Sequence, residues 1–231
     1  MDRRRFLSAG GALALAACAG PRLGEYEPTT VEAPQRRAGD SWTFRRIDGY
    51  NGLPRNVLTR TVSAASPSGF RVVTVDENGA TRDDALFEAP GVQVSGLLSE
   101  DGPIAGLFEP RLIVYDFPLY SGKAWRQGLY RIYGSGFRAY LSHSSRVEGW
   151  QDIPAGGRTY RALAIRRLFN FGPRNEFTPQ WPLYRSETEW YVPELRGPAS
   201  LQSDEWLQAP PGRINWPGNR FVSTLESFRL A

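Results

Sequence analysis

The chain has 231 residues, of which 41% are hydrophobic and 13% aromatic, and its formal net charge at pH 7 is +4. This length is sufficient for one domain with a substantial core. With one cysteine, one methionine and one histidine, the chain lacks the ligands of iron–sulfur, blue-copper and histidine-rich zinc sites, and we expect neither a metal site nor a cofactor.

The first 17 residues have the pattern of a signal peptide. Three arginines at positions 3–5 precede an apolar run of small residues over 10–17. The run is too short for a transmembrane helix, which needs about 20 apolar residues. Without the leader, 214 residues with a net charge of +2 remain, because three arginines and one aspartate are lost. Their arginines are scattered among acidic residues, and we therefore expect no nucleic-acid partner.

The basic start of the leader resembles an export signal. Arg3 and Arg4, followed by Phe6 and Leu7, resemble the twin-arginine motif. The pattern departs from the usual one at Asp2, which precedes the arginine pair. The resemblance implies export of a folded protein, and the general secretory route is the alternative.

The sequence LAAC at 15–18 resembles a lipobox, the motif of bacterial lipoproteins. The resemblance implies cleavage before Cys18 and acylation of that residue with diacylglycerol and a further chain such as palmitate. Two or three acyl chains hold a protein firmly on a membrane. We therefore expect a protein anchored through Cys18 on the periplasmic side of the cell envelope. Ala19 favours the outer membrane over the inner one.

Residues 18–40 are rich in proline, glycine and charge, and we interpret them as the lipidated cysteine and a flexible tether. From Ser41 the pattern changes to short β-branched and aromatic segments between turn residues, which predicts a single β-rich domain over 41–231. The expected strands cover residues 42–45, 57–64, 69–76, 92–98, 111–117, 124–133, 137–147, 160–171, 184–192 and 221–230.

The spacing of these segments, without helical periods between them, predicts a mainly β fold. We expect an antiparallel meander that forms a curved sheet or partial barrel. Asn78-Gly79 is typical of a hairpin turn, and we interpret Asp83-Asp84 as a solvated turn. The predicted core residues are Trp42, Phe44, Val62, Val73, Val75, Ile113, Trp125, Leu163, Ile165 and Trp190.

Three segments within residues 117–195 resemble an uncharacterised family of bacterial envelope β-proteins. They are FPLYSGKAW at 117–125, IPAGGRTYRALAI at 153–165 and SETEWYVPEL at 186–195. The resemblance implies an all-β envelope domain and assigns no catalytic residue.

His143 lies between serines, but Ser142 and Ser144 point to the other face of a strand. A nucleophilic triad would also need a carboxylate behind the histidine. No Gly-x-Ser-x-Gly elbow is present. We therefore expect a histidine at the surface or at a strand edge.

Glu187 and Glu189 fall on one face of a strand, about 7 Å apart by the strand rise. This spacing is compatible with a glycosidase pair. Arg185 shares that face, and an exposed ladder against arginines of a neighbouring strand, among Arg161, Arg166 and Arg167, explains the glutamates more simply.

Aromatic residues in two proline-containing segments form a possible binding loop. They are Phe171, Phe177, Trp181 and Trp216. Exposed aromatic rings of this kind stack on sugars or contact an apolar partner. The alternative is that they cover the open end of the sheet.

The sequence thus predicts a non-catalytic envelope lipoprotein whose β-domain is a scaffold or a binding module. Its partner would be an envelope protein, a glycan or a lipid or other apolar ligand. The alternative function is a carboxylate-dependent envelope hydrolase.

Overall fold

The computed structural model describes residues 30–97, 105–172, 182–209 and 213–231. Antiparallel strands and one short 3-10 helix make up its regular structure. The elements are β1 (Ser41–Asp48), β2 (Pro54–Ser66), β3 (Gly69–Asp76), β4 (Thr81–Ala89), β5 (Val92–Gly96), β6 (Gly106–Ile113), β7 (Ala124–Ile132), β8 (Arg138–Ala155), β9 (Arg158–Phe171), β10 (Leu183–Val192), η1 (Pro193–Leu195), β11 (Gly197–Leu207) and β12 (Trp216–Arg229).

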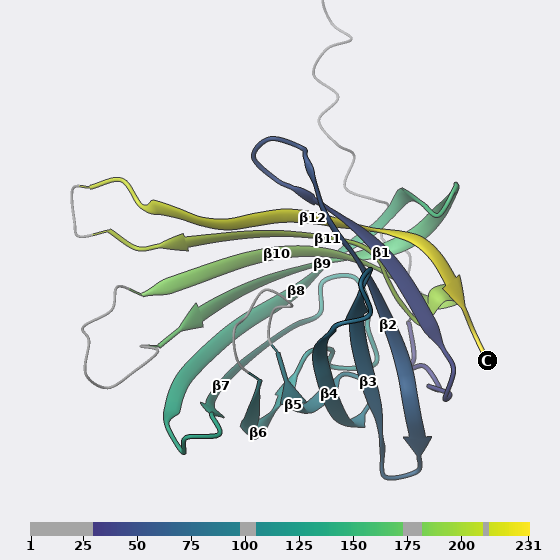
Figure 1. Cartoon of the computed structure of the whole chain (residues 1–231), viewed down its shortest axis with the longest axis horizontal. Helices are drawn as coiled ribbons and strands as arrows, with labels where there is room; N and C mark the ends of the chain where they lie inside the picture. Colours follow the sequence, from purple (N-terminus) through teal and green to yellow (C-terminus); the bar gives the residue numbers. More distant parts are fainter. Residues whose placement is uncertain (1–29, 98–104, 173–181, 210–212) are drawn as a thin grey trace, which may run out of the picture.

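The strands form a closed barrel in which each strand pairs with the next in the chain and β1 pairs with β12 (Figure 1). The predicted mainly β, antiparallel meander is confirmed. Closure removes the two free edges that an open sheet would present for aggregation. It also creates an interior that is separate from the outer face.

Two glycine-containing turns set the register of long hairpins. Gly79, in the predicted Asn-Gly turn between β3 and β4, has φ +80°, and Gly156 and Gly157 between β8 and β9 have φ +54° and +79°. Two successive residues with positive φ are the requirement of a two-residue hairpin turn. The hairpin of β8 and β9 extends from Ala155 opposite Arg158 to Leu141 opposite Phe171, and its register shifts by one residue at a β-bulge between Val147 and Gly149.

The strands β4 and β11 were not among the expected ones, and β6 begins earlier than the predicted segment at 111–117. The interpretation of Asp83-Asp84 as a turn is wrong, because both residues lie in β4. Asp84 forms an ion pair with Arg71 on the neighbouring β3, whereas Asp83 accepts a hydrogen bond from the amide of Leu97. The charged residues of β4 are compensated by partners on neighbouring strands. A prediction that relies on apolar alternation therefore misses this strand.

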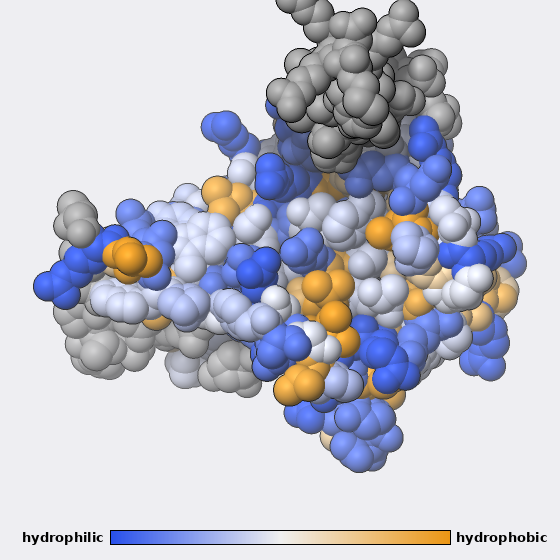
Figure 2. All heavy atoms as spheres, turned by 90° about the horizontal axis from the view of Figure 1, so that it is seen from above, coloured by the Kyte–Doolittle hydropathy of each residue, from blue (hydrophilic) through white to orange (hydrophobic). Residues whose placement is uncertain are grey.

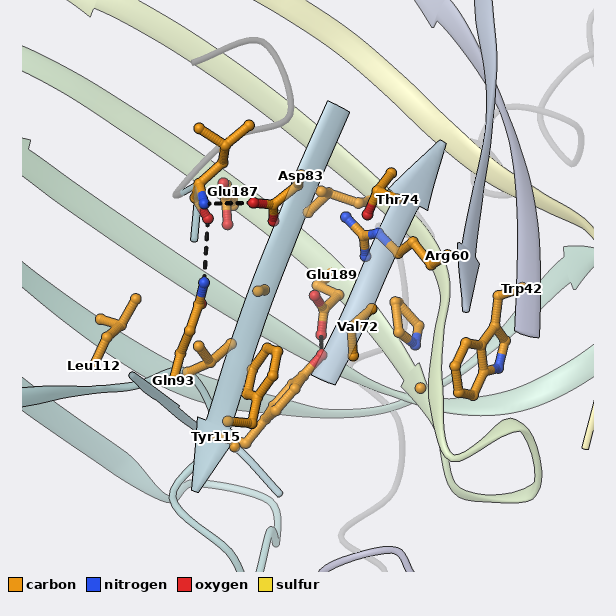
Figure 3. Close-up of a pocket in the computed structure, with 18 of the residues that line it drawn as sticks. Trp42, Arg60, Val72, Thr74, Asp83, Gln93, Leu112, Tyr115, Glu187 and Glu189 are labelled. Carbon is orange, nitrogen blue, oxygen red and sulfur yellow. Dashed lines mark hydrogen bonds between the residues drawn. The ribbon is translucent and has the colours of Figure 1, made fainter. Parts of the chain in front are cut away.

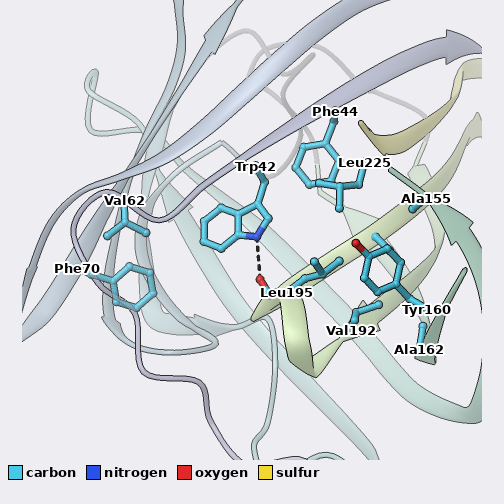
Figure 4. Close-up of a cluster of buried hydrophobic side chains, with 11 residues drawn as sticks. Trp42, Phe44, Val62, Phe70, Ala155, Tyr160, Ala162, Val192, Leu195 and Leu225 are labelled. Carbon is cyan, nitrogen blue, oxygen red and sulfur yellow. Dashed lines mark hydrogen bonds between the residues drawn. The ribbon is translucent and has the colours of Figure 1, made fainter. Parts of the chain in front are cut away.

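Three clusters of buried apolar side chains lie along the barrel. Figure 4 shows one of them, in which the indole of Trp42 donates a hydrogen bond of 2.8 Å to the carbonyl of Leu195. Of the predicted core, six residues are buried: Trp42, Phe44, Val62, Trp125, Leu163 and Ile165. Ile113 and Trp190 are half-buried and pack against the clusters.

The prediction is wrong for Val73 and Val75, which are half-buried. The buried face of β3 carries Phe70, Thr74 and Asp76 instead. Phe70 stacks on Phe87 of β4 at 4.8 Å, and this contact fixes which face of β3 lies inside. Val72 follows at the next inward position, and beyond it the inward positions carry the polar Thr74 and Asp76.

The segment of residues 31–40, which precedes β1, lies against the barrel, and we call it the strap. Val31 exchanges two backbone hydrogen bonds of 2.8 Å with Leu119. Asp40 is fully buried and accepts hydrogen bonds from Arg196 and from the amide of Ala231. The packed unit therefore begins before Ser41, whereas residues 18–29 of the expected tether lie outside the described residues.

On the outer face seen in Figure 2, hydrophobic side chains occur in small groups among charged ones. Scattered apolar residues of this kind are normal for a protein surface. The described part of the chain contains no helix of the length and apolar character needed to cross a membrane.

Candidate functional site

A cavity of about 200 Å³ lies inside the barrel, between the strands β2 to β6 on one side and β9 to β11 on the other. Phe70, Val72, Phe87 and Leu112 give it an apolar wall. Figure 3 shows this wall beside polar side chains that reach inward from both sides. Such a mixture of apolar surface and a few converging polar groups is typical of small-molecule sites.

Four buried charged side chains and one half-buried one form a network beside the cavity. Their strands alternate faces, so that residues two apart point inward together. The members are Arg167 of β9, Arg185, Glu187 and Glu189 of β10, and Glu205 of β11. The register explains their meeting, because Glu187 lies opposite Arg167 and Arg185 lies opposite Glu205.

The distances show how the charges are distributed. Arg167 Nη1 lies 3.2 Å from Glu189 Oε2 and 3.9 Å from Glu187 Oε2. Arg185 Nη1 donates a hydrogen bond of 3.2 Å to Glu187 Oε1, and its Nε donates one of 2.8 Å to Glu205 Oε1. Each buried carboxylate thus faces at least one guanidinium, which is the condition under which charges are tolerated in a protein interior.

Tyr115 completes the network from the chain segment after β6. Its hydroxyl donates a hydrogen bond of 2.6 Å to Glu189 Oε1, as Figure 3 shows, and the guanidinium of Arg167 lies 5.0 Å from the centre of its ring. Burial, together with the charge of Glu189, raises the pKa of Tyr115 well above its ordinary value. The phenol therefore remains protonated and serves as a donor.

Burial and pairing shift the ionisation of the network in different directions. Burial raises the pKa of Glu187, against the opposing effect of Arg185 and Arg167. For Arg167, burial disfavours the charged form, but Glu189 and other negative groups outweigh it and raise the pKa of the guanidinium. The network carries two positive and three negative side chains, and Glu187 is the group on which the excess negative charge falls.

On the opposite side of the cavity, Asp83 and Gln93 bind the same short stretch of backbone. Asp83 Oδ1 accepts a hydrogen bond of 2.9 Å from the amide of Leu97, and Gln93 Nε2 donates one of 3.4 Å to its carbonyl (Figure 3). These polar groups are occupied by the protein itself. They form the wall of the cavity and hold the chain after β5 against it.

The expectation of a surface histidine is wrong. His143 is buried on the inner face of β8 and stacks on Phe169 with ring centres 5.4 Å apart. Nδ1 lies 3.3 Å from Ser145 Oγ, and Nε2 lies 3.4 Å from Gln127 Oε1. Burial and the charge of Arg167 lower the pKa of His143 to about 4. The ring is neutral at pH 7, and within the described residues no carboxylate is bonded to it as a triad would require.

The expected pairing of Glu187 and Glu189 with arginines is present, but their expected exposure is wrong, because they are 8% and 6% exposed. Among the candidate partners only Arg167 takes part. Arg161 is bonded to Asp152, and Arg166 is exposed on the outer face. The alternation of β10 was visible in the sequence, but the side that faces the interior was not.

The proposed aromatic binding loop is only partly described. Phe171 is half-buried, packs beside Phe169 at 6.1 Å and carries the guanidinium of Arg185 4.8 Å above its ring. Trp216 is 41% exposed at the start of β12, opposite Leu207. Phe177 and Trp181 lie outside the described residues, as do Cys18 and the export residues Arg3, Arg4, Phe6 and Leu7.

Tyr115, Asp83 and Gln93 were not among the candidate site residues. They come from segments far from β10 in the chain, and no local pattern links them to it. In the described ranges, no group of three or more histidine, cysteine, aspartate or glutamate residues is placed to hold a metal ion.

Comparison with known proteins shows the fold. No known family matches the chain, and no curated protein matches it. A candidate lipoprotein from Parabacteroides distasonis superposes with a TM-score of 0.53 at 12% identity, covering 87% of this chain and all of that one. A candidate exported protein with a YmcC-like fold from Bacteroides fragilis superposes with a TM-score of 0.50 at 16% identity, again over 87% of this chain and all of that one.

Proposed function

We propose that this protein is a lipoprotein of the cell envelope whose barrel holds a small ligand in its interior without chemical conversion. The observation that carries the proposal is the cavity of about 200 Å³, with an apolar wall on one side and an internally paired charge network on the other. An enclosed apolar surface attracts a ligand, and the fixed polar groups orient it.

The membrane anchor rests on the leader. The lipobox ending at Cys18 assigns acylation to that residue, and the twin-arginine-like start assigns export of the folded barrel. The descriptions of the two structural neighbours, one as a candidate lipoprotein and one as a candidate exported protein, support this assignment. We place the anchor on the periplasmic side of the envelope, in the outer membrane.

The size of the cavity limits the ligand. A cavity of about 150 Å³ is known to hold benzene, and sites for drug-sized ligands measure about 300–1,000 Å³. The cavity inside the barrel, at about 200 Å³, is closer in size to the one that holds benzene than to most sites for drug-sized ligands. It therefore suits a ligand somewhat larger than benzene rather than a glycan or an intact phospholipid.

One observation favours the alternative of a carboxylate-dependent hydrolase. Burial raises the pKa of Glu187 at the cavity wall, and a raised carboxyl pKa is a property of general acids. Against this, Glu189 is bonded to Tyr115 and Arg167, so the second carboxylate is not free to activate water. A binding role requires neither carboxylate to change its partner.

The anchor is tested by expressing the full chain in a bacterium with two membranes and feeding an alkyne analogue of palmitate. We expect label in the wild-type protein, none in Cys18→Ser, and recovery with the outer membrane after fractionation. Label retained in Cys18→Ser would contradict the assignment of the anchor.

The ligand is tested by native mass spectrometry of the detergent-solubilised full chain. An additional mass corresponding to a small molecule, released on unfolding, is the expected result. A barrel that always appears without added mass, even after incubation with envelope extract, would contradict the binding function.

A further inference from the structure

The strap holds one arginine over the end of the cavity. The guanidinium of Arg36 lies 4.8 Å from the centre of the Trp42 ring and 5.9 Å from that of Phe70, and Arg36 lines the cavity. The strap is fastened on both sides of it, by the backbone pair of Val31 with Leu119 and by the buried Asp40. Arg36 is therefore a fixed part of the cavity wall.

Arg36 lacks an anionic partner. Its Nε is buried without a hydrogen-bond partner, and within the described ranges no carboxylate lies at ion-pair distance from it. The nearby Asp40 is already bonded to Arg196. Burial accordingly lowers the pKa of Arg36, against the opposing effect of Tyr191, Tyr115 and Asp40. Arg36 as a whole is half-buried, but a buried guanidinium nitrogen without a partner is rare in native proteins and calls for an explanation.

A carboxylate would supply the missing acceptor. It has two oxygens in one plane, which match the donors of a guanidinium. The apolar wall formed by Phe70, Val72 and Phe87 continues from the Arg36 end of the cavity. An acid with a short apolar body would satisfy both surfaces.

A surface groove lies next to this end of the cavity. It is lined by Pro34, Ala65 and Pro90 among others, and it shares Arg36 and Phe70 with the cavity. These two residues therefore lie between the cavity and the groove.

We propose that the cavity binds a small monocarboxylic acid, with Arg36 as the anchor of its carboxylate and the wall of Phe70, Val72 and Phe87 as the surface for its apolar body. This inference rests on the proposed function and names the ligand class of the same cavity.

The probe is hexanoate, with hexan-1-ol as the neutral molecule of equal chain length. Binding is measured by isothermal titration calorimetry at pH 7 on the full chain carrying Cys18→Ser, which prevents acylation. The test variant is Arg36→Gln, and its matched control is Arg37→Gln, because Arg37 is the exposed neighbour on the same strap. Thermal unfolding of each variant establishes that it is folded.

We expect hexanoate to bind at least tenfold more tightly than hexan-1-ol in the wild type. Arg36→Gln should weaken hexanoate at least tenfold and leave hexan-1-ol unchanged, whereas Arg37→Gln should change neither.

Equal binding of acid and alcohol, unchanged by Arg36→Gln, would overturn the assignment of the acid and leave the cavity as a binding site. Failure of both probes, in a barrel that carries no added mass in native mass spectrometry, would overturn the binding function as well.

Discussion

Arg167 and Glu187 lie directly opposite each other on β9 and β10, yet the shorter ion pair of Arg167 is formed with Glu189, at 3.2 Å against 3.9 Å. Glu187 is bonded instead to Arg185 on its own strand. The two glutamates therefore differ in role although they share a face. Glu189 is the main partner of Arg167 and Tyr115, and Glu187 carries the excess charge of the network.

This difference predicts opposite responses to two equivalent substitutions. Glu189→Gln removes the main counter-charge of Arg167 and should lower the free energy of unfolding by about 3 kcal/mol. Glu187→Gln leaves two arginines facing two glutamates and should change it by less than about 1 kcal/mol, or raise it. Urea unfolding at pH 7 measures the free energy of unfolding of both variants. Equal losses of stability would contradict the different roles assigned to Glu189 and Glu187.

Because the pKa of Glu187 is raised, the difference in stability between the wild type and Glu187→Gln should depend on pH. Because the folded state holds this proton more tightly than the unfolded state, the wild type loses stability as pH rises from the ordinary glutamate value through the raised one. Glu187→Gln lacks this loss, so its stability relative to that of the wild type should be higher at pH 7 than at pH 4.

The same variant tests the alternative function. An activity on envelope glycans that disappears in folded Glu187→Gln would favour the hydrolase.

Arg167→Met tests the central cation. It leaves Glu187 and Glu189 without their shared guanidinium and should cost about 3–5 kcal/mol in chemical denaturation. The control is Arg166→Gln on the outer face of the same strand, where Arg166 lies opposite Arg146. Removing one of two facing like charges should change stability by no more than about 0.5 kcal/mol. A comparable loss in both variants would mean that the interior pairing is not what stabilises β9.

Tyr115→Phe removes only the hydroxyl that donates to Glu189. A buried charged acceptor then loses a partner, and we expect a loss of about 1–3 kcal/mol. Tyr120→Phe provides the control, since Tyr120 is 44% exposed. If thermal unfolding did not distinguish the two variants, the bond between Tyr115 and Glu189 would contribute nothing to stability.

His143 is the single histidine of the chain, so its titration can be followed by NMR without assignment. We expect a midpoint near pH 4 in the folded protein. The unfolded chain binds this proton below about pH 6.5, and the folded one does not until about pH 4. Stability should therefore fall as pH falls across this window, by up to about 3 kcal/mol. His143→Gln should remove that part of the loss, and a folded-state midpoint near 6.5 would refute the burial of the ring.

The sequence by itself determined the strand-rich fold and several of its turns. Asn78-Gly79 occupies the predicted hairpin turn because glycine adopts positive φ at low cost, whereas the geometry of the turn at Gly156-Gly157 came from the structure. The alternation of β10 also placed Arg185, Glu187 and Glu189 on one face, since side chains repeat every second residue in a strand.

Only the tertiary structure decided which face is the interior. A charged face ordinarily points to water, but closure of the barrel brings Arg167 beside Glu189 and places Tyr115 within 2.6 Å of the same carboxylate. These partners are separated from β10 by many residues, and their contacts depend on the register of several strands at once. The sequence of the strap likewise indicates a polar linker. In the structure, Asp40 pairs with Arg196 and the guanidinium of Arg36 lies over the ring of Trp42. Local periodicity reports the two faces of a strand, whereas long-range pairing determines whether a charge on one of them can be buried.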